Sequence, residues 1–389
     1  MTAVEKTPLI VDIGPLRETF YTGIPNVIAE ICSRLLREDW LDLYFDVDGK
    51  WIDVDTLSKC LMEKSGRGMT TDFARFPDAA AIHDALREQG TQDRAVALYT
   101  DHRPPAKQCR REGKIVYDLS LILTPECHPP NTVRMYTADF EEQLNNTEIL
   151  FCISQATARD LAWIYGIEPD RLRVMPLGNT VDLEWSAEIS RRVGDRPIEP
   201  FLLILGSMEP RKNAGLVLEW ISQHPEVLDQ TRIVFAGRSA WGATFAEQVL
   251  AKSLTDAVKT GRIVFTGFVD EREKGSLLTG AAALLYPSVF EGFGLPILEA
   301  MAVGTPVLAS VSSSMPEVVG DCGYYFDPCD VASLHAAFSR FWADRATGAV
   351  LDVTARARTR SGWFSYDAAY QAVIEGLFPN RTVSTPVSL

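Results

Sequence analysis

The sequence lacks the features that mark several large classes of protein. Its longest apolar stretches, such as residues 201–205 and 281–286, are far shorter than the roughly 20 residues that a helix needs to cross a bilayer. The N-terminal residues lead directly into a strand-like segment, without the cationic and apolar regions of a secretory signal. The seven cysteines include no C-x-x-C pair, which is typical of reduced thiols. We therefore expect a soluble cytoplasmic protein.

Positive charge is also scarce. The 389 residues include 38 Lys and Arg against 52 Asp and Glu, which gives a formal net charge of −14. Such a chain is repelled by nucleic acids and by anionic membranes, so the balance excludes nucleic acid as a partner. An anionic ligand would need a local basic site.

Several catalytic motifs are missing. The sequence contains no G-x-G-x-x-G fingerprint, no Walker A motif, no G-x-S-x-G elbow and no H-E-x-x-H. Dehydrogenases, P-loop NTPases, serine hydrolases and zincins therefore lose their usual support. Cys127 and His128 are adjacent but have no further metal-ligating residues at a suitable spacing, so we expect no metal site.

Short apolar runs alternate with helical patterns along most of the chain, which is typical of an α/β fold with parallel sheets. The predicted strands are residues 9–13, 95–99, 114–117, 149–153, 173–176, 201–205, 232–236, 263–266, 283–286 and 306–309. Helices are predicted to begin at Pro25 and near Ala79, and another covers residues 364–378. Residues 182–200 are polar and have no long apolar face, and we place a domain boundary there. The predicted domains are residues 1–180, joined by residues 364–389, and residues 181–363.

The most informative segment is residues 286–309. A strand ends at Tyr286, a glycine-bearing loop follows, and a short helix is predicted from Pro296 to Gly304. The N–H groups at a helix start attract anions, because they carry roughly half a positive charge. Glu299, expected in the first turn, and Glu291, in the loop, can each accept hydrogen bonds from hydroxyls. The combination fits a diphosphate flanked by two polyols; the alternative is a pair of solvated surface glutamates.

The segment Glu291–Ala300 resembles the donor motif of the retaining GT-B glycosyltransferases of family 4, which is E-G-F-G-L-P-x-x-E-A. The resemblance implies two Rossmann-like domains that face each other across a cleft, with a C-terminal helix that crosses back to the first domain. It also implies that the first domain binds the acceptor and the second binds a nucleotide sugar. Glu299 would then hold the ribose and Glu291 the donor sugar. Backbone amides would complete the donor site at Gly292, Phe293, Gly294 and Leu295.

Residues 201–213 resemble the first strand of the family's second domain and the basic loop that follows it. Arg211 and Lys212 come after a strand and before a helix, where two cations can neutralise a departing diphosphate. Many members of the family have an arginine directly after Gly206, where this chain has Ser207, and we infer that Arg211 takes that arginine's role. Further donor contacts are expected at Gly206 and Ser207, and, beside the nucleobase, at Phe268 and Val269.

The first half of the chain is similar to the family more loosely. Residues 21–24 resemble the T-G-I loop of bacterial O-antigen and exopolysaccharide mannosyltransferases, which implies a donor contact at Gly23. The family usually has His-Asp after the strand at residues 114–117, where this chain has Tyr117 and Asp118. We predict that Asp118 faces the acceptor hydroxyl; the alternative is a turn or capping carboxylate. Asp101 and His102, which follow another predicted strand, are rival acceptor-side candidates, and Tyr117 is a further one.

The resemblance implies a metal-independent, retaining glycosyltransferase that uses a nucleotide-diphosphate sugar as donor and no cofactor. GDP-mannose is the first expectation, with UDP- and dTDP-sugars as alternatives. The implied acceptor is a glycan or a lipid-linked glycan of a surface polysaccharide such as lipopolysaccharide. Peripheral association with the inner face of the membrane or with polysaccharide-assembly partners remains open. The alternatives are a catalytically silent GT-B subunit, favoured by Tyr117, and an epimerase or phosphorylase on the same architecture.

Overall fold

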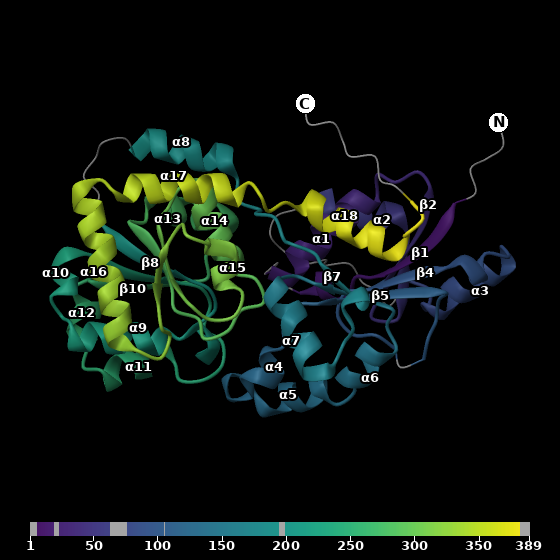
Figure 1. Cartoon of the computed structure of the whole chain (residues 1–389), viewed down its shortest axis with the longest axis horizontal. Coiled ribbons are helices and arrows are strands. Elements are labelled where there is room, and N and C mark those ends of the chain that lie inside the picture. The colour runs from purple at the N-terminus through teal and green to yellow at the C-terminus, as the bar shows by residue number, and fades with distance from the viewer. Residues whose placement is uncertain (1–5, 19–22, 63–75, 105, 194–198, 382–389) are drawn as a thin grey trace. The chain divides into compact units, whose positions relative to one another are not determined.

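The computed structural model describes residues 6–18, 23–62, 76–104, 106–193 and 199–381. The chain forms two compact units (Figure 1). The first unit consists of Met1–Asp118, Thr137–Leu177 and Ser365–Leu389, and the second of Leu119–Tyr136 and Gly178–Phe364. The segment Leu119–Tyr136, which the expected first domain includes, therefore groups with the second unit. One contact of this segment is the hydrogen bond that the Trp241 indole donates to the Cys127 carbonyl, with an N–O distance of 2.7 Å.

The first unit is built on a seven-stranded sheet with the order β3-β2-β1-β4-β5-β6-β7. All its strand pairs are parallel except β2 with β3. The strands are β1 (Thr7–Asp12), β2 (Leu41–Val47), β3 (Lys50–Ile52), β4 (Val96–Tyr99), β5 (Arg111–Val116), β6 (Ile149–Cys152) and β7 (Leu172–Val174). The helices are α1 (Gly23–Leu35), α2 (Val54–Met62), α3 (Ala80–Glu88), α6 (Phe140–Asn145), α7 (Gln155–Tyr165) and α18 (Tyr366–Leu377). Helices α4 (Ser120–Leu123) and α5 (Pro130–Thr137) lie between β5 and α6.

Helix α18 completes the first unit, although it comes from the end of the chain. It contacts α1, β5, β6 and β7 (Figure 1). A Cβ at Gly376 would lie 2.6 Å from the Phe151 ring, so only glycine lets the helix approach the sheet this closely. The Arg111 side chain of β5 donates to the Gly376 carbonyl at 2.9 Å, and the Tyr370 hydroxyl donates to Glu38 at 2.6 Å.

The second unit is built on a six-stranded parallel sheet with the order β10-β9-β8-β11-β12-β13. The strands are β8 (Phe201–Leu205), β9 (Arg232–Ala236), β10 (Ile263–Gly267), β11 (Ala283–Tyr286), β12 (Val307–Ser310) and β13 (Tyr324–Phe326). The helices are α8 (Leu183–Val193), α9 (Ala214–Gln223), α10 (Val227–Gln230), α11 (Phe245–Ala251), α12 (Thr255–Lys259), α13 (Glu271–Gly280), α14 (Leu295–Val303), α15 (Met315–Val319), α16 (Val331–Thr347) and α17 (Val350–Ser361). This is the Rossmann strand order, with its reversal between β8 and β11.

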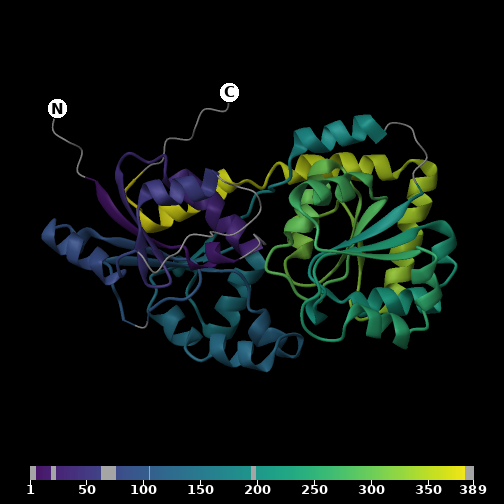
Figure 2. The same ribbon diagram turned by 180° about the vertical axis from the view of Figure 1, so that it is seen from behind.

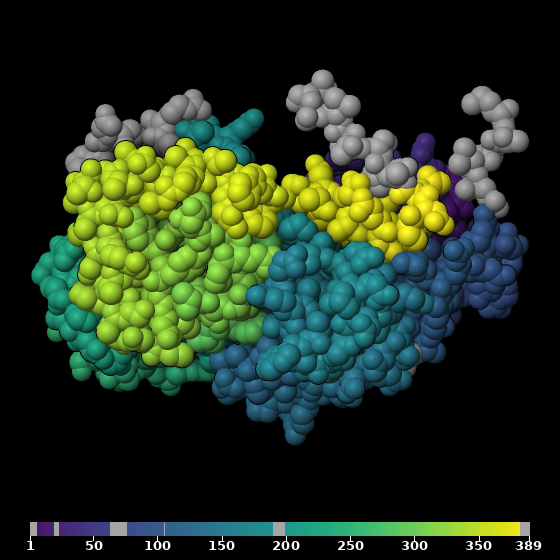
Figure 3. Space-filling model, viewed as in Figure 1, coloured from purple at the N-terminus to yellow at the C-terminus, as the bar shows by residue number. Residues whose placement is uncertain are grey.

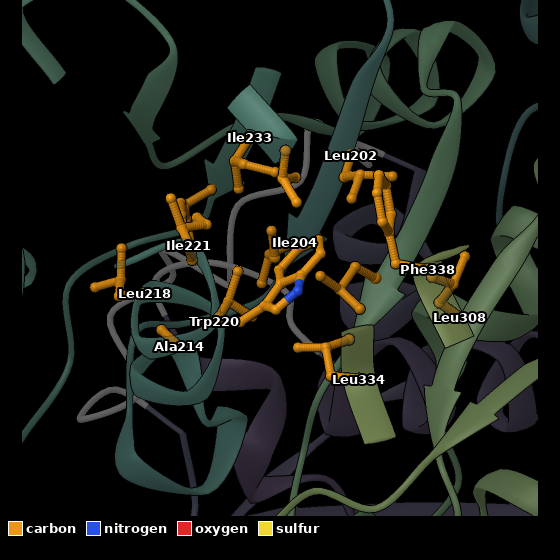
Figure 4. Close-up of a cluster of buried hydrophobic side chains, with 14 of the residues drawn as sticks. Leu202, Ile204, Ala214, Leu218, Trp220, Ile221, Ile233, Leu308, Leu334 and Phe338 are labelled. Atoms are coloured by element: carbon orange, nitrogen blue, oxygen red, sulfur yellow. The ribbon is translucent and has the colours of Figure 1, made fainter. Parts of the chain in front are cut away.

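The core of the second unit surrounds Trp220, which is fully buried on α9. Figure 4 shows its indole between Ile204 of β8 and Leu334 of α16. The Phe338 ring meets the indole edge-on, with centroids 5.0 Å apart. Helices α9 and α16 are thus held on the sheet by one continuous apolar layer.

Helix α17 lies at the surface of the second unit, as the space-filling view shows (Figure 3), and contacts α14, α15 and α16. Helix α8 contacts α13 and α14 in the same unit (Figure 2). None of the described helices is long and apolar enough to cross a bilayer.

The predicted α/β fold with two Rossmann-like units is confirmed, and all ten predicted strands are present with small shifts of their ends. Strand β13 was missed, and β2 and β3 lie in residues 41–90, where the sequence favours a strand or two without fixing their bounds. Helix α1 begins at Gly23, two residues before the Pro25 start expected from the sequence. The segment expected to be an irregular boundary contains α8.

Candidate functional site

The candidate site lies where the strand order of the second sheet reverses. Strands β8 and β11 are neighbours there, and the loops after them meet at the carboxyl edge of the sheet. The Val289 amide donates to the Arg211 carbonyl at 2.9 Å, which joins the two loops directly. Open α/β sheets bind their ligands at such a switch point.

Three of the expected donor residues form one ion cluster at this point. The Glu291 carboxylate accepts from the Arg211 guanidinium at 2.8 Å and from the Lys212 ammonium at 2.6 Å. Arg211 also donates to Glu209 at 2.7 Å, and Lys212 donates to the Tyr286 hydroxyl at 2.9 Å. Two cations and two carboxylates thus balance each other.

Electrostatics keep Glu291 ionised. Burial alone would raise the pKa of this carboxyl, since Glu291 is only 7% exposed, but Lys212 and Arg211 lower the pKa to about 2. Arg211 and Lys212 are half-buried beside it. An anion that displaced Glu291 would meet two cations in a partly desolvated place, where their attraction is strongest.

Serine hydroxyls fix the loop that carries Glu291. Ser314 donates to the carbonyls of Glu291 and Phe293, both at 2.9 Å, and Ser310 donates to the Ser288 carbonyl at 2.6 Å. Two further serines between them donate to the same loop, Ser312 and Ser313. Four serine hydroxyls therefore fix the loop through its carbonyls. The loop amides are thereby held in a fixed geometry, in which they can bind a ligand.

Helix α14 begins directly after this loop. Its N-cap, Gly294, has a φ of 103°, and no side chain caps the helix. Pro296 has no N–H, and the Ile297 amide donates to the Gly294 carbonyl at 2.9 Å. The Leu295 amide is therefore the first helix amide that can bind an anion, and the helix dipole favours an anion there. The Phe293 side chain is buried against Phe364, with centroids 5.6 Å apart, so this residue can offer a ligand only its main chain.

Glu299 lies in the second turn of α14, one turn later than the sequence analysis expected. It is 3% exposed, and its Oε1 atom accepts from the Lys274 ammonium at 2.7 Å and from the Thr180 hydroxyl at 3.3 Å. Burial alone would lower the pKa of Lys274, but the carboxylates of Glu299 and Glu271 raise it, so the ammonium stays charged. The alternative of solvated surface glutamates is therefore wrong for both Glu291 and Glu299.

Glycines make room along the same edge. A Cβ at Gly237, after β9, would lie 1.9 Å from the Gly206 carbonyl oxygen, after β8. The backbone segments that follow these two strands are therefore in direct contact, which only glycine at position 237 allows. Gly206 has a φ of 140°, and the Lys212 side chain passes over it. The Ser207 hydroxyl donates to Glu209 at 3.1 Å. Beyond β10, Phe268 is 51% exposed and Val269 is half-buried, at the same carboxyl edge.

The expected acceptor-side residues lie in the first unit. Asp101 follows β4, and Tyr117 and Asp118 follow β5, so all three are at the carboxyl edge of that sheet. His102 is exposed, and its ring nitrogen lies 3.0 Å from the Gln143 amide. Gly23 is the exposed first residue of α1, and the rest of its expected loop, residues 21–22, lies outside the described residues.

The partners of the expected donor residues were not predicted from the sequence: they are Glu209, Lys274, Thr180 and Tyr286. Lys274 lies on α13 and Thr180 lies before α8, both far from Glu299 along the chain. No local pattern marks such pairs. The serines of residues 310–314 are visible as a polar run after a strand, which is a weak signal for a loop that fixes its neighbour.

Comparison with known proteins supplies independent evidence. Residues 186–358 match the family model described as glycosyl transferases group 1. The chain is 29% identical over 275 residues to O-antigen chain mannosyltransferase B of Escherichia coli, and the match covers 69% of each protein. It is 26% identical over 333 residues to the serotype-specific mannosyltransferase WbdA of Escherichia coli, covering 82% of this chain but only 39% of that relative's length.

Solved structures show the same fold at low identity. WaaG, described as a glycosyltransferase involved in lipopolysaccharide biosynthesis, has a TM-score of 0.65 and 16% identity, covering 95% of this chain and 99% of its own. Sucrose-phosphate synthase from Thermosynechococcus elongatus has a TM-score of 0.66 and 17% identity, covering 95% and 97%. The comparisons thus agree with the resemblance given by the motifs: residues 186–358 match a glycosyl transferases group 1 domain, and the chain has the fold of GT-B glycosyltransferases.

Proposed function

We propose that the protein is a retaining mannosyltransferase that transfers mannose from GDP-mannose to a glycan or lipid-linked glycan acceptor during surface-polysaccharide synthesis. The names of the relatives support mannose as the sugar and O-antigen-like glycan as the product. The observation that carries the donor half of the proposal is the ion cluster of Glu291, Arg211 and Lys212 beside the start of α14.

The donor diphosphate replaces Glu291 as the partner of the two cations. Arg211 and Lys212 then neutralise the leaving group together with the amides of Gly292–Leu295, and the released Glu291 carboxylate accepts hydroxyls of the sugar. Glu299, with Lys274 on one oxygen, offers its other oxygen to the ribose. Because these cations supply the positive charge at the diphosphate, the proposal includes no metal ion and no cofactor.

Transfer breaks the bond between the sugar's anomeric carbon and the diphosphate oxygen, and the acceptor oxygen bonds to the same carbon on the same face. The acceptor proton passes to the departing phosphate oxygen. Both glutamates are committed to donor binding, so neither is left as a covalent nucleophile of the kind that glycosidases use. Asp118, at the edge of the first unit's sheet, is the side chain that we propose to orient the acceptor hydroxyl.

The proposal is tested by thermal unfolding with GDP, UDP, dTDP and ADP, on the native protein and on Glu299→Ala and Lys212→Ala. A nucleotide at a hundred times its dissociation constant stabilises the folded state by about 2.7 kcal/mol. We expect a shift with GDP that both substitutions abolish. A folded native protein that responds to none of the four nucleotides would overturn the donor assignment.

A catalytically silent subunit is the second candidate, because Tyr117 stands where the family usually has histidine. It would bind GDP in the same experiment but release none from GDP-mannose with any glycan acceptor. Release of GDP that depends on a mannan-type acceptor would exclude it.

A further inference from the structure

The first unit has a switch point of its own, between β1 and β4, and a network around Asp12 bridges it. The Asp12 carboxylate accepts from the Gly14 amide at 2.9 Å, from both the amide and the hydroxyl of Thr100 at 3.0 Å, and from the Asp101 amide at 3.1 Å. Asp12 is therefore occupied in shaping the two loops.

Lys114 is the unusual residue beside this network. It lies inside β5 and is only 5% exposed, yet among the described residues its ammonium makes no hydrogen bond and no ion pair. Its electrostatic partners are Asp101, Asp12 and Asp139. Burial lowers the pKa of Lys114 to about 8, which these three carboxylates partly oppose. The Lys114 nitrogen is not among the described side-chain atoms that are both fully buried and without a hydrogen bond, so the ammonium keeps some accessible surface at which a ligand can reach it. A largely buried ammonium gains from any acceptor that a ligand supplies there.

The Tyr117 hydroxyl is a second unsatisfied group at the same place. It is buried and has no hydrogen-bond partner in the described part of the chain. Burial raises the pKa of Tyr117, and Asp101 and Asp12 raise it further, so this hydroxyl lies close to the same two carboxylates. Two independent polar groups, from β5 and from the loop after it, thus lack partners at one edge of the sheet.

The charged residues around Lys114 and Tyr117 restrict which ligand can complete the hydrogen bonds of these two side chains. Asp46 is the register partner of Asp12 on β2, and burial, with Asp12 and Asp48 adding, raises its pKa to about 6. The nearby cation Arg103 is engaged by Glu112 in a fully buried pair. A phosphate group would meet several carboxylates and one ammonium, whereas sugar hydroxyls can both accept from Lys114 and donate to the carboxylates.

We propose that Lys114 is a specificity-determining residue of the acceptor site: its ammonium donates to oxygens of an uncharged sugar, and the surrounding carboxylates exclude phosphorylated sugars. The inference rests on the proposed glycosyltransferase function, since it names the class of acceptor. It adds a residue that no motif marks, and it makes the acceptor a neutral glycan end rather than a sugar phosphate.

The test compares two probes, methyl α-D-mannoside and mannose 6-phosphate, by saturation-transfer NMR titration of the full-length protein saturated with GDP. We expect the neutral glycoside to bind at least about tenfold more tightly than the phosphate. Lys114→Met should weaken the glycoside about tenfold or more, since a hydrogen bond from a charged group is lost. Lys59→Met, on the exposed face of α2, is the matched control and should change neither probe.

Three results would overturn the proposal: equal or tighter binding of mannose 6-phosphate, unchanged glycoside binding in a folded Lys114→Met protein, or no glycoside binding by native protein that does bind GDP. In the last case the donor proposal survives and the acceptor inference fails. If Lys114→Met does not fold, the comparison of the two probes on native protein still decides. Asp101→Asn gives a further check. Because it removes one carboxylate, it should reduce the ratio between the dissociation constants of mannose 6-phosphate and methyl α-D-mannoside.

Discussion

Glu291 has to serve two partners in turn. In the ligand-free protein its carboxylate neutralises Arg211 and Lys212, and in the proposed complex the diphosphate takes over these cations while Glu291 binds the sugar. The carboxylate therefore competes with the diphosphate before it assists transfer. This double role separates its effect on nucleotide binding from its effect on rate.

Glu291→Gln should strengthen GDP binding and slow transfer. The substitution leaves two cations against the single carboxylate of Glu209, so we expect GDP to bind about tenfold more tightly. Transfer should fall by about a hundredfold, since the sugar loses a charged hydrogen-bond acceptor. Calorimetric titration with GDP and the rate of GDP release from GDP-mannose measure the two effects.

Glu209→Gln is the matched control for this prediction. It removes the other carboxylate on Arg211, which accepts from Nη2, whereas Glu291 accepts from Nη1. It should strengthen GDP binding in the same way and leave most of the transfer rate. Weaker GDP binding by Glu291→Gln would show that the carboxylate does not compete with the diphosphate.

The sequence predicted the individual site residues better than their environment. Arg211, Lys212 and Glu291 were all expected near one diphosphate, and the structure brings them together. The Lys274 partner of Glu299 could not be predicted, because 25 positions separate the two residues and only the packing of α13 against α14 joins them. Pairing across elements is a property of packing, and no local pattern records it.

Among the elements, α17 holds the C-terminal ends of two helices near the site. Arg358 donates to the Val303 carbonyl, at the end of α14, at 2.6 Å. Arg360 donates to the carbonyls of Val318 and Glu317, at the end of α15, at 2.8 and 2.7 Å. Cations at these ends satisfy orphan carbonyls and complement the helix dipoles. Glycine follows each helix with a positive φ, 85° at Gly304.

Arg358→Ala and Arg360→Ala should each lower the free energy of unfolding by about 1 kcal/mol, since each leaves helix carbonyls without a charged donor. Arg356→Ala is the control, because its nearest contacts to Asp321 are long, at 3.4 and 3.9 Å, and it should change stability by less than about 0.5 kcal/mol. Urea unfolding measures all three. Equal effects at the three arginines would contradict a specific role at the helix ends.

The elements that the sequence did not place lack a clear apolar pattern, for different reasons. Strand β2 carries Asp42 and Asp46, which interrupt its apolar pattern. Asp46 is tolerated because it lies beside Asp12 of β1, where the sheet has other polar groups. Strand β13 has only three residues, too few for a periodic signal. Helix α8 is mostly polar, so its sequence does not predict a buried face. Its packing against α13 and α14 stabilises it as a helix. By contrast β8, β9 and β11 are short, apolar and buried, and were predicted to the residue.

At the scale of the whole molecule, the chain builds its first unit from three separate segments. The last of these begins at Ser365 and carries α18, whereas the expected donor residues other than Gly23 belong to the second unit. The chain therefore enters the second unit twice, with Leu119–Tyr136 and with Gly178–Phe364, and returns to the first unit each time. Stability of the first unit should depend on the end of the chain, while nucleotide binding should not.

Deleting residues 365–389 should therefore unfold the first unit and leave GDP binding intact. The deletion removes the Tyr370 contact with Glu38, the Arg34 pair with Asp367 and the edge contact of Phe378 with Trp40. Limited proteolysis with mass spectrometry should find new cleavage sites in the first unit alone, and GDP should still protect the second. Gly376→Leu tests the same contact without shortening the chain, since its side chain would collide with Phe151. If either variant lost GDP binding together with the first unit, the two units would have to fold as one, and the independence argued from their separate sheets would be wrong.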